Sequence, residues 1–505
     1  MHAANVATCQ RAIPYKEENI VKDDIKKKEP KQVWVHFDQI RQIPHGSRNE
    51  KMLGDYVVAV AKKNGLECLR DDVGNVLVRK KASRGKEKVD GVVLQGHLDM
   101  VNEKNSNVVH NFEKDPIRLK IEGDYLMAQG TTLGSDNGVG VAVALALMDT
   151  KTICHGPIEF LFTVDEETGL TGANNLKPGY LKSKRLINLD TEEDGSVYIG
   201  CAGGADTILR LKLKIESTPK ESVFIKVRVC GLKGGHSGVD IHEERGNAIK
   251  ILARILCKIL ERGKLNLIDI FGGNKRNAIP REAEALIAVN RKDFEMVQKI
   301  ITDVEKALKG EYAKRDKDLK VTLEKLDRTD KNKAITATMS KKIINLLNGL
   351  PHGVLAMSAE IPDLVETSTN LAVVNIASNV VTIDISSRSS VATALRAALD
   401  KIKSIAELAN VKVEFGGCYP GWKPDPNSPL LKLVKSVYKD LYKMEPSVKA
   451  IHAGLECGII GEKYHGIDMI SIGPQIENPH SPAERVKIST VAKFWNYLTH
   501  ILEKL

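Results

Sequence analysis

Apolar residues recur along this chain at two spacings, and these spacings predict where helices and strands lie. From about Gln32 onward, 33–43 and 49–65 carry apolar residues at helical spacing, and a proline and a glycine end the first of them. An apolar helix is also expected over 138–150. Short apolar runs predict strands at 66–71, 75–80, 92–95, 158–164 and 185–190. Strands that alternate with helices, several apolar on both faces, favour a largely parallel sheet covered by helices.

The pattern changes near residue 205. Range 222–232 alternates between apolar and polar residues like a half-exposed strand, and 247–263 has helical spacing. A charged helix is expected over 294–320. Further strands are expected at 265–271, 283–290, 371–379, 380–390 and 411–417, and one more helix at 391–410. This β-α-β-β order, found roughly twice, predicts a separate α+β domain and suggests a duplication.

After 416–424 the first pattern returns. Helices are expected over 428–442 and 491–505, and a short apolar strand over 467–473, which we expect to rejoin the first sheet. The predicted fold class is therefore α/β, a mostly parallel sheet domain covered by helices with an inserted α+β domain of duplicated β-α-β-β type. Its predicted parts are the sheet domain at 31–205 plus 416–505 and the insertion at 206–415.

Residues 1–30 differ from the rest of the chain. They contain EE, DD and KKK but no apolar segment of the kind that a secretory signal needs. The acids also argue against a mitochondrial transit peptide. We expect residues 1–30 to form a disordered extension.

Composition excludes several classes of function. The 505 residues are 42% hydrophobic and 28% charged, which is typical of a soluble protein of several domains. No apolar run approaches the roughly 18 residues that would span a bilayer. The net charge is +10, but acids are mixed with the bases and only 5% of residues are aromatic, so we expect no nucleic-acid or membrane partner. The eight cysteines form no CxxC pair, which argues against a structural zinc knuckle and fits a reducing, cytoplasmic setting.

Acids and histidines stand where the predicted strands of the first sheet end. They are His97 and Asp99 after 92–95, the acids 165–167 after 158–164, Asp190 at the end of 185–190, and His480 in the loop after 467–473. Asp136 lies in the glycine-rich turn GTTLGSDNG before a helix. Because ligands bind at the carboxyl ends of strands in open α/β sheets, we expect these side chains to converge in one crevice.

Taken singly, each of these features has an ordinary structural explanation. His97 and Asp99 could be a hydrogen-bonded pair, GSDNG a turn, and the acids after 158–164 a helix N-terminus. Together they predict a metal centre, because so many carboxylates would be costly to bury without cations. Nitrogen and oxygen ligands without thiolate favour Zn, Mn or Co over Mg or Ca. Two metals sharing one carboxylate fit five candidate ligands, as in aminopeptidases.

With these residues the chain resembles a known family, the aminoacyl-histidine dipeptidases (cytosolic non-specific dipeptidases). This family lies within the co-catalytic zinc superfamily of carnosinases, aminoacylases and glutamate carboxypeptidases. The resemblance runs from about Gln32 to the C-terminus. It is carried by LQGHLDMV, GTTLGSDNGVG, EETGLTGA, INLDTEEDG, GCAGG, LKGGHSG, RNAIPREA, HAGLECG and SIGPQIENPHSP.

The resemblance implies a role for each candidate at the metal centre. His97 and Asp190 are expected to bind one metal, Glu167 and His480 the other, and Asp136 to bridge them. Glu166 would be the general base that activates the metal-bridging water. Asp99 would orient the His97 ring by accepting its other N–H. The implied cofactors are two divalent ions, Zn²⁺ first, with Co²⁺ or Mn²⁺ as alternatives.

The resemblance also implies that the insertion acts as a lid over the substrate. His236 would stabilise the tetrahedral oxyanion, Asn277 would hydrogen-bond the substrate, and Arg388 would bind its free carboxylate. Gly454 would offer backbone contacts. His452 and Glu456 in the same motif receive no role, and a homodimer is a further expectation.

The expected function is a metallo-dipeptidase that hydrolyses unblocked dipeptides, including Xaa-His substrates such as carnosine. An alternative is an N-acyl amino acid deacylase or related amidohydrolase that uses the same two-metal site. A rival of another class is an inactive peptide-binding protein that keeps the fold. The presence of Glu166 and of all five ligands argues against that rival.

Overall fold

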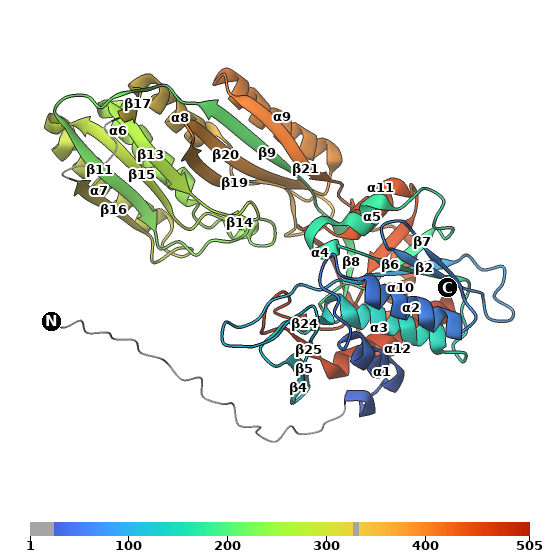
Figure 1. The fold of residues 1–505 in the computed structure, drawn as a ribbon. Coiled ribbons are helices and arrows are strands. Elements are labelled where there is room, and N and C mark those ends of the chain that lie inside the picture. Colours follow the sequence, from blue (N-terminus) through green and yellow to red (C-terminus); the bar gives the residue numbers. More distant parts are fainter. Residues whose placement is uncertain (1–24, 327–332) are drawn as a thin grey trace, which may run out of the picture.

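Two β-sheets dominate the computed structural model, which describes residues 25–326 and 333–505 (Figure 1). In the first sheet the central strands β6, β3, β7 and β23 are parallel to one another, and β8 is parallel to β22. The pairs β1–β2, β2–β6 and β23–β8 are antiparallel. In order across the sheet, the strands are β1 (Glu67–Arg70), β2 (Val76–Lys80), β6 (Ile158–Thr163), β3 (Val92–His97), β7 (Arg185–Asn188), β23 (Asp468–Ser471), β8 (Ser196–Cys201) and β22 (Ser447–Ile451). The sheet is therefore parallel in its centre and mixed towards its edges.

Helices cover both faces of the first sheet (Figure 1). On one side lie α4 (Glu166–Gly169), α5 (Thr171–Asn175) and α11 (Glu456–Lys463). On the other lie α1 (Lys31–Ile40), α2 (Lys51–Lys63), α3 (Ser135–Asp149), α10 (Pro429–Tyr442) and α12 (Ile488–Lys504). Every residue of α3 from Ser135 to Met148 is buried, which explains why its apolar residues show no one-sided spacing.

A small antiparallel sheet extends the first domain near the strand ends. It consists of β24 (Ile476–Glu477), β25 (Arg485–Lys487), β5 (Tyr125–Ala128) and β4 (Leu119–Glu122). It places the 478–484 loop, which contains His480, beside the segment that leads from β5 into α3.

Most of the predicted N-terminal extension, residues 1–24, lies outside the described residues. Its last part, 25–30, is ordered, contrary to our expectation. Ile25–Lys27 forms a short 3-10 helix, and Ile25 is buried in the first hydrophobic core. The Trp34 indole N–H donates to the carbonyl of Glu29 over 3.2 Å. An apolar anchor and this hydrogen bond hold the segment against α1.

The second sheet has nine strands, and all its neighbouring strands pair antiparallel. Its main order is β16 (Lys320–Leu326), β11 (Ser222–Cys230), β15 (Ala283–Asn290), β13 (Leu265–Gly272), β19 (Val365–Ala377), β20 (Val380–Ser389), β9 (Gly203–Lys212) and β21 (Lys412–Tyr419), with β18 (Gly353–Met357) paired to β19. Four helices pack on it, α6 (Ala248–Arg262), α7 (Phe294–Glu311), α8 (Ala337–Gly349) and α9 (Ala392–Leu408). Their buried residues form a hydrophobic core of their own, drawn from 209–411.

The chain crosses between the two sheets twice, and the two crossings are neighbours. Cys201, at the end of β8, and Trp422, just after β21, donate a backbone N–H to each other's carbonyl over 2.9 Å. Gly203 and Gly421 also lie too close for side chains, because a Cβ on either would come within 2.6 Å of the other's backbone nitrogen. The glycines of this region therefore permit a close approach of two strands.

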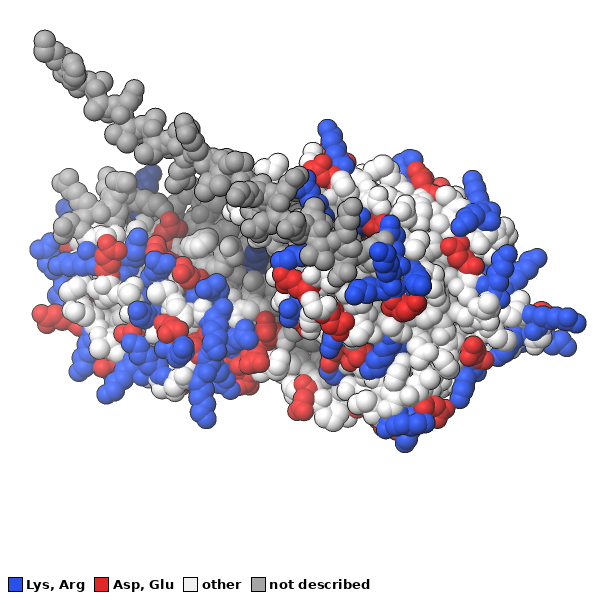
Figure 2. Space-filling view, turned by 90° about the horizontal axis from the view of Figure 1, so that it is seen from below, with Lys and Arg blue, Asp and Glu red and all other residues white. Residues whose placement is uncertain are grey.

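The surface carries acids and bases side by side. On the face seen in Figure 2, Lys and Arg are interspersed with Asp and Glu on both halves of the molecule. Among residues 25–326 and 333–505, no helix combines the length and the apolar character needed to cross a membrane.

Candidate metal centre

Three parallel strands bring most of the candidate ligands to one edge of the first sheet. His97 is the last residue of β3 and pairs in register with Thr163, the last residue of β6, which α4 and its two glutamates follow. On the other side of β3, Gln95 pairs with Asn188, two residues before Asp190. The parallel register therefore aligns these strand ends, as the sequence pattern predicted.

Asp136 lies between two imidazoles, one on each of its carboxylate oxygens. Nε2 of His97 is 3.0 Å from Oδ1, and Nε2 of His480 is 3.0 Å from Oδ2. His97 Nε2 is also 3.3 Å from Asp190 Oδ1, and His480 Nε2 is 3.0 Å from Glu167 Oε2. The structure thus brings all five predicted ligands together, in two groups that share Asp136.

The protonation of this cluster follows from its charges. The hydrogen bonds of His480 to Asp136 and Glu167 raise the pKa of its imidazole to about 11. Burial would lower the pKa of His97, but Asp190 and Asp136 raise it well above its ordinary value. Burial raises the pKa of Asp190 to about 6 against the opposing charge of His97. Protons on the histidines here supply positive charge that divalent cations would otherwise supply.

The donor atoms fit a divalent metal. Nitrogen and oxygen donors from His97, Asp136 and Glu167 lie within 4.8 Å of one another, all on buried or half-buried residues. Oε1 of Glu167 is buried and has no hydrogen-bond partner within the described part of the chain. A buried carboxylate oxygen without a donor is costly unless a cation or water meets it.

Asp99 lies beneath His97, although its contact differs from the predicted one. Nδ1 of His97 is 3.0 Å from the backbone carbonyl of Asp99 and 3.4 Å from its carboxylate Oδ1. That carboxylate accepts hydrogen bonds from the backbone N–H groups of Glu166 and Glu167 and from the Ser47 hydroxyl. Burial would raise its pKa, but His97 and these donors lower it to about 2. Asp99 therefore holds both the ring and the first turn of α4.

Glu166 stands at the start of α4, next to the predicted ligand Glu167. Asp165, with a φ of 53°, turns the chain from β6 into this helix. Burial raises the pKa of the Glu166 carboxyl well above its ordinary value, and Asp190 and Glu456 add to the rise while His97 opposes it. A carboxyl whose pKa is raised in this way holds a proton more readily than an exposed glutamate does.

Two glycines of the quoted motifs make room for Asn137. Its side-chain amide donates to Asp190 Oδ1 over 2.7 Å and to the carbonyl of Leu189 over 2.8 Å. A Cβ on Gly96 or on Gly140 would come within 2.2 or 2.6 Å of Asn137 Oδ1. The sequence pattern indicated no role for Asn137 beyond a possible turn, whereas the structure shows its amide bonded to the candidate ligand Asp190.

A layer of buried polar side chains crosses the first sheet beneath the ligands. Gln95 Nε2 and Thr163 Oγ1 each donate to Glu456 Oε2 over 2.6 Å. Asn188 Nδ2 donates to Gln95 Oε1 over 2.7 Å, and the Ser471 hydroxyl donates to Asn188 Oδ1. These partners come from four adjacent strands, β6, β3, β7 and β23. The sequence left Glu456 without a role because its partners lie far away along the chain.

Glu456 and Glu192 are two acids near the predicted ligands, and the sequence pattern indicated no role for either of them. Burial raises the pKa of Glu456 to about 7, and burial together with the nearby Asp136 raises that of Glu192 to about 9. The signal that could have found Glu192 is its position two residues after Asp190, in DTEED. Side chains two apart on an extended segment point the same way.

Comparisons with known proteins identify the family. A model of peptidase family M20/M25/M40 matches residues 93–504. The chain belongs to this peptidase family. It is 43% identical over 476 residues to the cytosol non-specific dipeptidase of Escherichia coli (strain K12), covering 94% of this chain and 98% of that protein.

Solved structures agree with this assignment. The crystal structure of aminoacylhistidine dipeptidase from Vibrio alginolyticus matches with a TM-score of 0.89 at 41% identity, over 96% of this chain and 98% of that one. Aminopeptidase PepT from Bacillus cereus matches with a TM-score of 0.55 at 18% identity, over 94% and 99%, and shows the fold alone. The predicted family is confirmed, and the chain is a metallopeptidase that hydrolyses peptide bonds.

The remaining candidates of this M20 peptidase form a second group. Arg388 lies on β20 of the second sheet, His236 lies in a separate two-stranded pairing, and Asn277 and Gly454 lie outside the strands. Gly238 is enclosed by two of them and by His452, since a Cβ there would lie 3.1 Å from His236 Cε1, 3.3 Å from Arg388 Cδ and 2.2 Å from the His452 carbonyl. The Arg388 guanidinium donates through Nη1 to the Tyr419 hydroxyl over 2.7 Å, while its buried Nε has no partner among the residues described.

The other two predicted substrate residues flank this group. The backbone carbonyl of the exposed Asn277 accepts a hydrogen bond from the Ser237 N–H over 2.8 Å. This bond lies beside the short pairing of β12 (Gly235–His236) with β14 (Ala278–Ile279), in which His236 is opposite Ala278. Gly454 lies against the Tyr419 ring, 2.8 Å from a Cβ built on the glycine. The other three predicted substrate residues thus lie near His236 or near Tyr419.

The hydrogen bonds of His236 fix its tautomer. The backbone N–H groups of Gly238 and Val239 point at its Nδ1 over 3.3 and 3.0 Å, so Nδ1 accepts and the ring proton is on Nε2. Burial and the charge of Arg388 lower the pKa of this imidazole, which keeps the ring neutral. His236 therefore offers a single N–H donor at Nε2.

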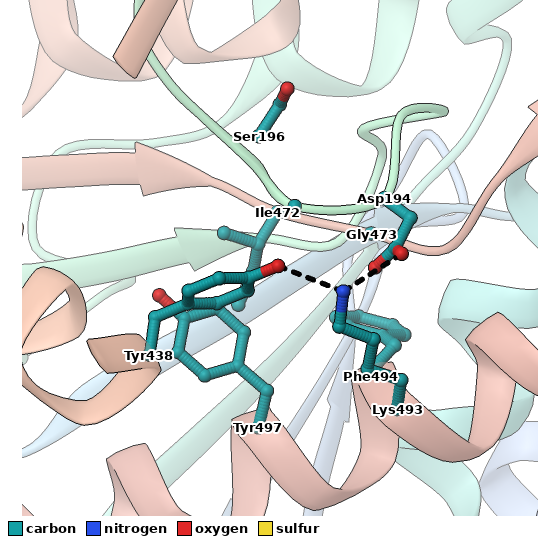
Figure 3. A pocket seen from close by; sticks show the side chains of 9 residues that line it. Asp194, Ser196, Tyr438, Ile472, Gly473, Lys493, Phe494 and Tyr497 are labelled. Carbon is teal, nitrogen blue, oxygen red and sulfur yellow. Dashed lines mark hydrogen bonds and ion pairs between the residues drawn. The ribbon is translucent and has the colours of Figure 1, made fainter. Parts of the chain in front are cut away.

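A pocket of the first domain is lined by none of the five predicted ligands (Figure 3). It lies beside α12, and Lys493 donates there to Asp194 Oδ2 over 2.9 Å and to the Tyr438 hydroxyl over 2.8 Å. Because its one ammonium is already bonded to a carboxylate and a hydroxyl, we do not assign substrate binding to this pocket.

Asp99 also belongs to a second acidic group, which it forms with Glu50 and Asp165. Glu50 accepts backbone hydrogen bonds from Asp165 and Arg48, and Asp165 accepts bonds from the hydroxyls of Thr168 and Thr171. These donors satisfy the carboxylates without a cation.

The protonation of His452 predicts acid sensitivity of the fold. Burial, Arg388 and His236 lower its pKa to about 3, whereas in the unfolded chain it titrates near 6.5. Between these values only the unfolded chain takes up the proton, so stability from this group is full above pH 6.5 and falls as the pH drops towards 3. From pH 7.5 to 5.5 we expect the wild type to lose about 1 kcal/mol more unfolding free energy than His452→Gln. Denaturant titrations of the metal-free proteins measure this difference, with His242→Gln, at an exposed imidazole, as the control. Equal losses in all three proteins would contradict the neutral state of His452.

Proposed function

We propose that this M20 peptidase is a dipeptidase for unblocked dipeptides, including Xaa-His substrates such as carnosine. The observation that carries the proposal is the cluster in which Asp136 joins His97 and His480, with one further carboxylate on each ring. It is supported by the resemblance over nearly the whole length of two relatives named as dipeptidases.

We propose that the five side chains hold two divalent cations, with Zn²⁺ as the first choice and Co²⁺ or Mn²⁺ as alternatives. His97 and Asp190 would bind one ion, Glu167 and His480 the other, and Asp136 both. Each imidazole lies about equally near Asp136 and its second carboxylate, at 3.0 to 3.3 Å, which supports this division. When bound, the ions would polarise the scissile carbonyl and lower the pKa of the attacking water.

Glu166 would act as the general base and then as the general acid. Its carboxylate would take the proton of the attacking water and pass it to the nitrogen of the leaving amine. Its half-buried position and its raised pKa suit a group that must hold that proton between the two steps. Asp99 would keep this geometry by binding the backbone of Glu166 and of Glu167.

The unit formed by residues 206–415 would act as a lid that contributes substrate contacts, while 31–205 and 416–505 form the catalytic domain. The N–H at Nε2 of His236 would donate to the oxyanion that develops on the scissile carbonyl. Asn277 would hydrogen-bond the substrate, and Gly454 would offer backbone contacts beside Tyr419.

Arg388 would bind the free carboxylate of the substrate. Its guanidinium is fixed by the Tyr419 hydroxyl, and its buried Nε is free to donate. A planar guanidinium with a donor held ready is well suited to a carboxylate. This contact would favour substrates with a free C-terminus.

The cellular setting completes the proposal. We expect the protein to act in the cytoplasm, which is supported by a relative named for the cytosol and by free cysteines among the described residues. A homodimer is our expectation for its assembly.

A substrate panel tests the proposed function. Metal-loaded protein is offered a Xaa-His dipeptide, an N-acetylated amino acid and a longer peptide, and amine release is followed. The dipeptide should give the highest kcat/KM. Preferred cleavage of the acetylated substrate would favour a deacylase instead, and no cleavage of any would favour a binding protein.

The adjacent glutamates should separate chemistry from metal binding. Glu166→Gln should keep about two bound ions and lose 10²- to 10⁴-fold in kcat, because it removes only the proton carrier. Glu167→Gln is the matched control and should lower metal affinity. Metal analysis after gel filtration, with steady-state kinetics, measures both. A fully active Glu166→Gln would show that another group is the base.

Arg388→Ala should raise KM for dipeptides by roughly 10- to 100-fold with a smaller change in kcat, because a charged hydrogen bond to the substrate is lost. Arg388→Lys should recover part of the loss. The control is Arg228→Ala on β11, which breaks an exposed ion pair between Arg228 and Glu282 and should leave KM unchanged. An unaltered KM in Arg388→Ala would remove the carboxylate contact from the proposal.

A further inference from the structure

One loop carries both a candidate ligand and a buried carboxylate. The 478–484 loop joins β24 to β25 and contains His480 and Glu484. The His480 side chain is 50% exposed, so packing alone does not fix its ring. Glu484 is only 2% exposed, four residues further on, at the other end of the loop.

Glu484 accepts hydrogen bonds from the segment that carries Asp136. Its Oε2 accepts from the backbone N–H groups of Leu133 and Gly134 over 2.7 and 3.1 Å. Its Oε1 accepts from the backbone N–H and the hydroxyl of Ser135 over 2.7 and 2.6 Å, and from the Asp136 N–H over 3.3 Å. One carboxylate thus binds four consecutive residues that end at the shared ligand.

These donors belong to the N-terminus of α3, which has no side-chain cap of its own. The residue before the helix is Gly134, with a φ of 71° and no side chain to accept a bond. A helix start normally takes an acceptor from its own first residues. Here the acceptor comes from a position 349 residues from Ser135 in the sequence.

We propose that Glu484 is the positioning residue that sets the separation of Asp136 from His480, so that metal affinity depends on it. The proposal rests on the two-metal function proposed above. Glu484 ties the Asp136 segment to the loop of His480, and the pairing of β25 with β5 anchors the end of the loop that carries Glu484. Without the carboxylate, α3 could remain folded while the two ligands lose their fixed spacing.

The alternative is that Glu484 only stabilises the start of α3, and a matched control separates the two roles. Glu159 is also a buried carboxylate of the first domain, 4% exposed, and it accepts from the backbone N–H groups of Lys182 and Ser183 over 2.9 and 2.7 Å. It lies on β6, four residues before Thr163 at the ligand-bearing end. Glu159→Gln therefore disturbs buried hydrogen bonds without touching a ligand segment.

The test compares Glu484→Gln with Glu159→Gln in the full chain. Metal-free melting and titration calorimetry with Zn²⁺ are measured, together with the visible spectrum of the Co²⁺ form. Both variants should melt earlier than the wild type. Only Glu484→Gln should bind metal 10- to 100-fold more weakly, with a changed Co²⁺ spectrum, because residues that orient ligands act on affinity by this amount.

Each outcome decides one proposal. A wild type that binds no metal would overturn the two-metal function itself. A wild type that binds metal while Glu484→Gln binds with the same affinity and spectrum would overturn the role of Glu484. If Glu484→Gln does not fold, Ser135→Ala removes one of its donors and should weaken metal binding in the same direction. Unchanged binding in Ser135→Ala would then overturn the inference.

Discussion

A single carboxylate, that of Asp136, contacts both imidazoles of the site, and the rest of the molecule is arranged around this contact. Two rings approach its two oxygens from different parts of the chain, His97 from a strand end and His480 from a loop. Such a group is unfavourable in a protein interior unless every charge is compensated. The compensation requires Asp190 and Glu167 at fixed positions, and therefore requires strands whose ends stay aligned.

The parallel centre of the first sheet supplies that alignment. Strands β6, β3 and β7 end together because their register is fixed residue by residue. The polar layer through Gln95, Asn188 and Glu456 then joins the same strands by side chains, directly below the ligands. Buried hydrogen bonds of this kind are specific in direction, whereas apolar packing tolerates small shifts. A layer of hydrogen-bonded polar side chains within an otherwise apolar sheet thus supports the candidate site.

The convergence of the five candidate ligands could be predicted from the sequence alone, because each follows an apolar strand or a glycine-rich turn and has a ligand-type side chain. The supporting residues could not be predicted in this way. Gln95, Asn188 and Glu456 matter only because their strands are neighbours, and strand order is not visible in local patterns. Asp99 lies between these cases: its place beside His97 was expected, but the ring lies nearer to its backbone carbonyl than to its carboxylate. The alternation of strands and helices predicted the sheet, but it could not predict the antiparallel edges.

The paired crossings at Cys201 and Trp422 bear on how such a chain could have arisen. Since the two residues are hydrogen-bonded neighbours, the first sheet would need only a tight turn to connect them directly. Everything between them can be regarded as one very long hairpin loop that folds around its own core. An ancestral enzyme could therefore have acquired or enlarged this unit without any change in the strand order on which its chemistry depends. Substrate selection and bond cleavage would then be free to evolve on separate cores.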